Sequence, residues 1–195
     1  MDPDTPFQVY VYSRYPAVNV FLNGKPVQAT PANASYSTQF TATFSVPYAA
    51  GNLTTVAYDE SGKVADRRTL LSAGAAAALR LDVDRPKIKA SRSDLAYVTV
   101  SVVDAEGRVV ANADAVVSVK VTGAAELAAL GTGNPEDTAS FFQGARRVYR
   151  GQAVAVVRPS LGSDGMTVQS GEATVTVSAA GLQGASCTVE VGGSK

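Results

Sequence analysis

The stretch QFTATFSV, residues 39–46, alternates strictly between polar and apolar side chains. Successive side chains of a β-strand point to opposite faces, so this alternation gathers all the apolar groups on one face. The apolar set is Phe40, Ala42, Phe44 and Val46. The pattern therefore predicts a strand with one buried face and one solvent-exposed face.

The same period of two extends outward from this strand through the first third of the chain. It recurs in FQVYVYS (7–13), VNVFLNGKPV (18–27) and LTTVAYDESGKVADRRTL (53–70). Asn23-Gly24 is a pair that accepts the positive φ angles of a tight hairpin, and Asp59–Lys63 predicts a second turn. No stretch here repeats every 3.6 residues over three turns, so this part is expected to be strands and turns.

A change in composition marks the expected domain boundary. LSAGAAAALRLDVDRP (71–86) passes from small residues into alternation, which indicates a linker near 73–76 followed by a strand. The predicted domains are residues 1–73 and 74–195. A domain of about 73 residues buries only roughly 60% of its unfolded surface, so the first is expected to lean on the second or on missing neighbours.

The second part repeats the strand pattern at greater length. Alternating stretches are LAYVTVSVVDAEGRVV (95–110), AVVSVKVTG (115–123), GQAVAVVRP (151–159), EATVTVSAAG (172–181) and ASCTVEV (185–191). Six to eight short strands, with a turn signal about every ten residues, are typical of an immunoglobulin-like sandwich. The predicted fold is all-β, with two tandem immunoglobulin-like β-sandwich domains.

Charge and composition exclude several classes of partner. The chain has 195 residues, with 17 basic and 17 acidic side chains that cancel, so no global field attracts nucleic acid or an anionic membrane. No apolar run approaches the ~20 residues that span a bilayer, and the opening MDPDTPFQ is unlike a signal peptide. The expectation is a cytosolic protein or a piece of a longer exported chain.

The absence of histidine removes catalytic triads, histidine metal sites and histidine acid–base chemistry. Cys187 is the single cysteine, so neither an internal disulfide nor a thiolate zinc cluster forms. It shares a predicted strand face with Val189 and Val191, which indicates a buried, inert thiol. No catalytic residue, cofactor or metal is predicted. Asp82, Asp84, Asp94 and Asp104 could contribute to a calcium site, which remains an alternative although the usual D-x-D-x-D-G loop is absent from the sequence.

The least regular stretch is GTGNPEDTASFFQGARRVYRG (131–151), with two acids, three arginines and three aromatic residues. Glycoside cleavage needs two carboxyl groups about 5–9.5 Å apart. The adjacent acid pairs of this chain, Asp59/Glu60 and Glu136/Asp137, lie in turn or loop contexts and are expected to be solvated. Three basic residues, Arg146, Arg147 and Arg150, are expected to pair with Glu136 and Asp137 and hold the loop. The alternative is that they bind a carboxylate or an anionic sugar.

Four segments together resemble a known family: VNVFLNGKPV (18–27), FSVPYAAGNLTTVAYDESGKV (44–64), LRLDVDRPKIKASRSDLAYVTVSVVDAEGRVV (79–110) and GTGNPEDTASFFQGARRVYRGQAVAVVRP (131–159). They look like the C-terminal β-sandwich domains of family 2 glycoside hydrolases, in particular β-galactosidase-like enzymes of Bacteroides-type bacteria. The chain departs from the family at ASRS (90–93) and at Phe142. The resemblance implies a small sandwich followed by an immunoglobulin-like or invasin-like one.

That resemblance also implies missing partners. The family's catalytic glutamates lie on a (β/α)8 barrel of about 250 residues, and no motif here matches theirs. The expected partner is therefore an N-terminal catalytic part of the same chain, in a parent that is periplasmic or secreted. In the resembling domains the GNP loop belongs to the sandwich itself. We expect Asn134 to bond backbone groups, Phe141 or Phe142 to fill the core edge, and Arg147 and Tyr149 to fasten the returning strand.

The resulting prediction is a non-catalytic accessory segment that supports or orients a glycosidase barrel. An alternative is a carbohydrate-binding module, with Tyr10, Tyr12 and Tyr15 as an exposed strip that stacks on sugar rings, joined by Tyr36. A bacterial surface-adhesion domain is a third hypothesis. Two unlike domains do not make the repeat array that an adhesin of this kind would need.

Overall fold

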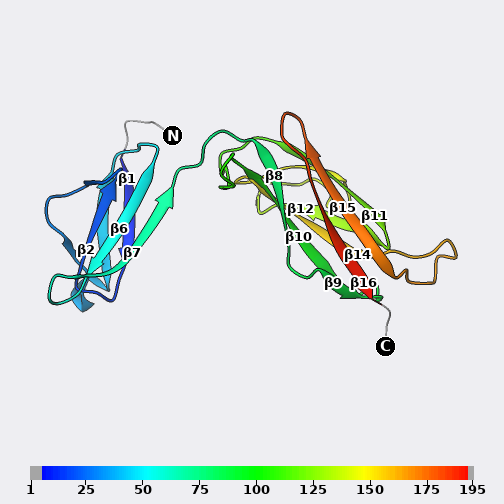
Figure 1. Ribbon diagram of the computed structural model, residues 1–195, viewed down its shortest axis with the longest axis horizontal. Coiled ribbons are helices and arrows are strands. Elements are labelled where there is room, and N and C mark those ends of the chain that lie inside the picture. Colours follow the sequence, from blue (N-terminus) through cyan, green and yellow to red (C-terminus); the bar gives the residue numbers. More distant parts are fainter. Residues whose placement is uncertain (1–5, 193–195) are drawn as a thin grey trace. The chain divides into compact units, whose positions relative to one another are not determined.

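A computed structural model describes residues 6–192, almost entirely as strands and the turns between them. The chain divides into two compact units, Met1–Ser72 and Ala73–Lys195, one residue before the boundary expected from the sequence. The all-β class predicted above is what the structure shows, and each unit has its own core (Figure 1).

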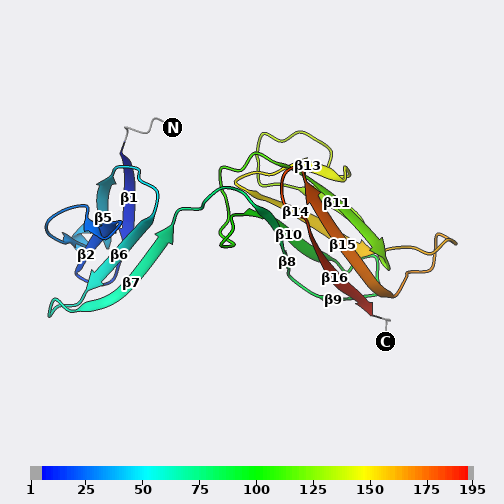
Figure 2. The ribbon, with the colours of Figure 1, turned by 45° about the horizontal axis from the view of Figure 1, so that its top comes forward.

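Unit 1 contains two sheets. Its strands are β1 (Phe7–Tyr12), β2 (Ala17–Leu22), β3 (Lys25–Pro26), β4 (Ala32–Asn33), β5 (Thr41–Val46), β6 (Asn52–Tyr58) and β7 (Val64–Leu71). The smaller sheet pairs β1 with β5, side by side in Figure 2, and the larger has the order β3-β2-β6-β7 with β4 on β2. A single 3-10 turn, η1 (Tyr36–Thr38), precedes β5.

The core of unit 1 forms where the alternating strands of the two sheets face each other. Its buried residues are Val18, Val20, Ala34, Ala42, Phe44, Val46 and Ala57. The hairpin between β2 and β3 uses Asn23 and Gly24 at φ 51° and 80°, the positive angles that its type requires. Phe44 is the one aromatic side chain in this core that is almost fully buried, at 2% exposed.

The strand expected over 39–46 begins two residues later than the alternation predicts. Gln39 and Phe40 have φ angles of 52° and 56°, which belong to a left-handed turn, and Phe40 is 45% exposed. The prediction that Phe40 faces the core is therefore wrong. Hydrogen bonds explain the difference, because the N–H groups of Gln39 and Phe40 close a turn on Tyr36 and Ser35.

Unit 2 is a two-sheet sandwich (Figure 1). Its strands are β8 (Ala78–Val83), β9 (Lys87–Lys89), β10 (Ala96–Val103), β11 (Val116–Gly123), β12 (Ala125–Gly131), β13 (Ala145–Arg147), β14 (Gln152–Pro159), β15 (Gly171–Ala179) and β16 (Ala185–Gly192). The sheets have the orders β12-β14-β10-β8 and β13-β11-β15-β16-β9, antiparallel except for the β16–β9 pair. Nine strands exceed the six to eight that the sequence suggested.

The core of unit 2 is built largely from valine, a β-branched residue that packs well on pleated strands. Fully buried positions alternate along β10, β14 and β15, as in Val98, Val157 and Val175. Residues 73–77, where the sequence suggested a linker near 73–76, precede β8 without regular structure. Within unit 2 this linker is fixed by Gly74, whose N–H donates to Asp104 Oδ2 at 2.8 Å.

Candidate functional site

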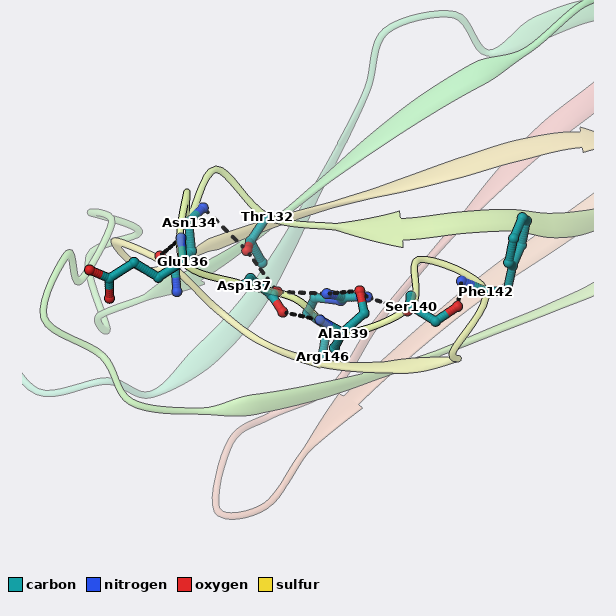
Figure 3. Close-up of polar contacts among 8 residues, drawn as sticks. All are labelled: Thr132, Asn134, Glu136, Asp137, Ala139, Ser140, Phe142 and Arg146. Carbon is teal, nitrogen blue, oxygen red and sulfur yellow. Dashed lines mark hydrogen bonds and ion pairs between the residues drawn. The ribbon is translucent and has the colours of Figure 1, made fainter.

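The connection between β12 and β13 is the longest irregular segment that the sequence singled out (Figure 3). It starts as a turn around Asn134, whose side-chain oxygen accepts the Glu136 N–H at 3.0 Å. The Asn134 carbonyl accepts the Asp137 N–H at 3.2 Å, and its own N–H donates to Thr132 Oγ1 at 3.4 Å. Asparagine side chains commonly organise turns in this way, and backbone bonding is the role expected of Asn134.

Arg146, the buried residue of β13, holds this loop. Its guanidinium donates to Asp137 Oδ2 at 2.6 Å and to the Ala139 carbonyl at 3.2 and 3.3 Å, and also to the Ser140 carbonyl (Figure 3). The Arg146 side chain is 2% exposed and that of Asp137 is 20% exposed. A buried guanidinium needs a carboxylate and further acceptors to offset its desolvation, and the loop wraps to provide them.

The Asp137 carboxyl is held in its charged form. Its pKa lies below the ordinary value, chiefly because Arg146 donates to it and also because the Ala139 N–H donates to Oδ1 at 3.0 Å. Thr132 Oγ1 adds a longer contact of 3.5 Å to Oδ2. Such a carboxylate is a structural anchor rather than a proton donor at neutral pH.

The two phenylalanines do not fill the core edge. Phe141 is 54% exposed and Phe142 is 88% exposed, so the prediction that one of them is buried is wrong. Phe141 instead lies against Gly131, where an added Cβ would come within 3.1 Å of its ring, and 5.2 Å from the Arg146 guanidinium. Arg146 is the residue buried here, because its guanidinium donates to the carbonyls of Ala139 and Ser140. An aromatic ring at this place would leave these loop carbonyls unpaired.

The residues after Arg146 hold the returning strand through the backbone. Arg147 lies opposite Val116 in the β11–β13 pair and forms an exposed ion pair with Asp114. Tyr149 exchanges two backbone hydrogen bonds with Gln152, at 2.9 and 3.0 Å, across a turn at Arg150.

The expectation that all three arginines pair with the loop acids is correct only for Arg146. Arg147 pairs with Asp114 instead of a loop acid. Arg150 lies 5.5 Å from the Tyr149 ring centroid and has no carboxylate within ion-pairing distance among residues 6–192.

An open depression of about 490 Å³ lies beside this loop, lined in part by Glu136, Asp137 and Arg147. Two neighbouring carboxylates could resemble an acid–base pair, but Asp137 is engaged by Arg146 and Glu136 points away from it (Figure 3). A general acid needs a carboxyl with a raised pKa, whereas that of Asp137 is lowered. This arrangement is suited to holding the loop.

The four aspartates considered for calcium are spread over separate contacts. Asp82 pairs with Arg80 at 3.0 Å, Asp84 accepts the Tyr97 N–H at 2.7 Å, and Asp94 pairs with Arg85. Asp104 accepts backbone N–H groups within its own turn and from the linker. Over residues 6–192 the structure contains no group of three or more potential metal-ligating side chains.

The tyrosines of unit 1 separate into two groups. Tyr10 and Tyr12 are 58% and 78% exposed on the outer face of β1, as the alternation predicted. Tyr15 does not join them, because its ring packs partly buried against the core of unit 1, and its place in the exposed strip is a wrong prediction. Tyr36 lies apart on η1, edge-on to Phe40 with 6.2 Å between ring centroids.

Cys187 lies on the face of β16 that carries Val189 and Val191, as expected, and is half-buried. Burial raises the pKa of its thiol, which keeps it protonated.

Two buried charged residues were not identified from the sequence. Asp104 is 2% exposed and holds the turn after β10, where its Oδ1 accepts the Arg108 N–H at 2.8 Å. Arg146 lies two residues before the buried Val148, so strand alternation alone would have pointed it inward. No helix in the described part of the chain is long and apolar enough to cross a membrane.

Two family models match the chain. The model of the glycoside hydrolase family 2 C-terminal domain 5 matches residues 79–188. A domain of unknown function matches residues 4–66.

Similar proteins cover nearly the whole of this chain. The beta-galactosidase BoGH2A of Bacteroides ovatus is 29% identical over 172 residues, which is 88% of this chain and 19% of that protein. Two solved structures of a family 2 glycosyl hydrolase from Bacteroides cellulosilyticus are 32% identical with TM-scores of 0.85, and cover 96% of this chain. The chain spans 23% and 25% of those two structures. A beta-glycosidase from Bacteroides vulgatus, 22% identical with a TM-score of 0.79, shares the fold.

Proposed function

Because the chain belongs to the family 2 glycoside hydrolases, with the family's C-terminal domain 5 at residues 79–188, we propose that it is an accessory segment of a larger enzyme. It supports and orients a catalytic domain that lies elsewhere in the parent protein and takes no part in bond cleavage itself. The coverage carries this proposal, since 88% of the chain corresponds to 19% of the relative from B. ovatus. The catalytic barrel of such an enzyme needs about 250 residues by itself.

The side chains support this function because the buried charges stabilise loops. Asp104 binds the linker and its own turn, while Arg146 and Asp137 hold the loop before β13. The acids of both adjacent pairs lie in turns, and Asp59 accepts the Lys63 N–H at 3.0 Å. Loops held by buried charges keep the second sandwich folded, as a segment that supports a neighbouring domain requires. By analogy with the B. ovatus relative, the substrate proposed for the parent is a β-galactoside.

The first test is an activity assay of the isolated chain on nitrophenyl β-galactoside. We expect no turnover above buffer, because a glycosidase needs a raised-pKa acid beside a second carboxylate. Activity that co-purifies with the folded chain through two chromatographic steps would overturn the accessory function.

A second test measures the supporting role in the parent enzyme. Deleting residues 73–195 should lower the temperature of inactivation and leave kcat at low temperature within about twofold, because the reacting groups lie elsewhere. The matched control is the full-length Arg147→Met variant, which changes an exposed ion pair and should behave as the parent does. Identical inactivation curves for the deletion and the parent would contradict a supporting function.

A further inference from the structure

The side of unit 1 between β1 and β7 is open. The larger sheet has four strands in its main order, whereas the sheet facing it has only β1 and β5. All eight residues of β7 are exposed, so the smaller sheet does not cover this strand. An uncovered edge strand beside a two-stranded sheet leaves a groove that the fold itself does not fill.

A cavity of about 230 Å³ lies in this groove. Its inner wall is apolar, formed by Val11, Val18 and Ala57, of which Val18 is fully buried. Its rim is aromatic and charged, with Tyr12 and Arg14 among the residues that line it. The volume is below the ~300–1,000 Å³ of sites for drug-sized ligands, so it suits one ring of a longer molecule.

The rim carries more positive than negative groups. Arg14, Arg67 and Arg68 line the cavity together with one carboxylate, Asp66. Arg68 Nε lies 3.4 Å from Asp66 Oδ2, in a pair whose side chains are 85% and 46% exposed. Within residues 6–192 neither Arg14 nor Arg67 has a carboxylate within 4.0 Å. Arg67 lies opposite Val56 in the β6–β7 pair and projects from the other face of the sheet, so the guanidinium groups available to an anionic ligand in the groove are those of Arg14 and of the exposed Arg68.

The backbone fixes where these groups stand. Arg68 lies opposite Thr55 and Asp66 opposite Ala57 in the β6–β7 pair, so both project from the same face as the core residue Ala57. On the other wall, a tight turn carries Arg14 because Ser13 Oγ accepts the Tyr15 N–H at 3.0 Å. The Arg14 guanidinium lies 5.5 Å from the Tyr15 ring centroid, which positions it further.

These features match the chemistry of an acidic sugar. Guanidinium groups bind carboxylates through paired, charge-assisted hydrogen bonds. A tyrosine ring offers a flat apolar face with a polar end, which suits a sugar ring, and the partly buried Tyr15 lines the cavity beside Arg14. We propose that this groove binds a uronic-acid residue of a polysaccharide, with its carboxylate at Arg14 and Arg68 and its ring against Tyr15.

Charged residues on an edge strand also have a plainer use, because they discourage pairing with another chain. That use accounts for Arg67 and Arg68 on β7. It does not account for Arg14, which lies on the facing wall, or for the apolar cavity between the two walls. A supporting role in a parent enzyme does not require this site either, so the proposal stands apart from the accessory function.

The test is calorimetric titration of the 195-residue chain with tetragalacturonic acid and with uncharged galactotetraose. We expect the acidic oligosaccharide to bind, the neutral one to bind at least roughly tenfold more weakly, and added salt to weaken the acidic one. The double variant Arg14→Gln/Arg68→Gln should lose roughly tenfold or more in affinity. Lys25→Gln is the matched control, because β3 lies at the opposite edge of the same sheet from β7.

Amide chemical shifts locate the binding. On addition of tetragalacturonic acid, we expect the amide chemical shifts of Ser13, Arg14 and Tyr15 to change and those of the loop before β13 to stay the same. The proposal is overturned by equal affinity for the neutral oligosaccharide, or by a double variant that binds as the parent does. Equal binding of a tetraglutamate peptide also overturns it and assigns the groove to an acidic protein segment.

Discussion

Arginines hold the loop before β13 and line the groove of unit 1, yet the arginines of the two regions do different things. In the loop, the Arg146 side chain is 2% exposed and its donors are taken by Asp137 and two backbone carbonyls. In the groove, Arg68 is 85% exposed beside a single carboxylate, and Arg14 has none among residues 6–192. The difference shows that burial and the number of acceptors already present decide whether an arginine stabilises the fold or remains free for a ligand.

The two units also differ in the size of their cores. In the described residues the core of unit 2 has 21 buried residues and that of unit 1 has seven, so each core position matters more in unit 1. A small domain of this length has a total stability of only about 4–11 kcal/mol. Unit 1 is therefore where single substitutions should have their largest effects.

Phe44→Ala should give the largest effect of all. Phe44 is 2% exposed in the smaller core, and removing its ring should cost about 3–5 kcal/mol, enough to unfold much of unit 1. Native-state hydrogen exchange should show protection lost in β5 and β6 and kept in β10 and β14. Phe40→Ala is the matched control, because that ring is 45% exposed on the preceding turn. A loss below about 1 kcal/mol for Phe44→Ala would show that the core of unit 1 is not organised around this ring.

The second-largest effect is expected at the buried ion pair of Arg146 and Asp137. Arg146→Met should cost about 2–4 kcal/mol in urea unfolding, because it leaves Asp137 and two carbonyls without their donor. Arg147→Met removes only an exposed pair with Asp114 and should cost less than about 1 kcal/mol. Adding Asp137→Leu to Arg146→Met should recover part of the loss, since the unpaired charge is then gone. Equal costs for the two arginines would contradict the contrast between buried and exposed guanidinium groups.

Much of the fold could be predicted from alternation alone. The resemblance to the C-terminal domains of family 2 glycoside hydrolases is confirmed, and so is the all-β class. The strand β12 was missed because AELAALG (125–131) alternates poorly and has good helix formers. Its register shifts between Leu127 and Ala129, and such an irregularity breaks the period of two. Pairing with β14, a long-range contact, makes this segment a strand.

The candidate sites were less predictable because their geometry depends on contacts distant in the sequence. Asn134 makes its contacts within three residues of itself, which is the range that local turn chemistry describes. Alternation with Val148 points Arg146 inward, but the acceptors that its buried guanidinium needs lie on a loop that folds back over it, and local patterns do not report that fold. The groove depends on the different widths of two sheets, a property of topology that combines residues 11–15 with residues 55–68.

A smaller effect distinguishes the two phenylalanines of the loop. Phe141→Ala should cost about 1 kcal/mol, because the half-exposed ring contacts Gly131 and the Arg146 guanidinium. Phe142→Ala should stay within about 0.5 kcal/mol of the parent, since that ring is 88% exposed. Urea unfolding of both variants checks the order. A larger cost for Phe142→Ala would mean that this ring is covered in solution and that Arg146 is not the only residue that anchors the loop.

The smallest expected effect concerns Asp164, an exposed carboxylate that has several hydrogen-bond donors. It tests whether the number of donors and acceptors around a charged group matters when the group is not buried. Asp164 is exposed, yet its carboxylate accepts the Met166 and Thr167 N–H groups at 3.0 and 2.9 Å and the Thr167 hydroxyl. These bonds, the hydroxyl first, lower its pKa from 3.8 to about 2. Because the folded value lies below the unfolded one, the carboxylate stabilises its turn fully above about pH 4. That contribution is lost as the pH falls toward about 2.

Carboxyl chemical shifts followed from pH 5 to pH 1 measure the Asp164 pKa directly. Thr167→Val removes the hydroxyl donor, which contributes most to the shift, so the pKa of Asp164 should rise toward 3.8 while unit 2 stays folded. Ser163→Ala is the matched control in the same turn and should leave it unchanged. A parent value near 3.8 would mean that exposure to water outweighs the three donors. The number of partners would then no longer explain by itself why Arg146 is structural and Arg14 is free.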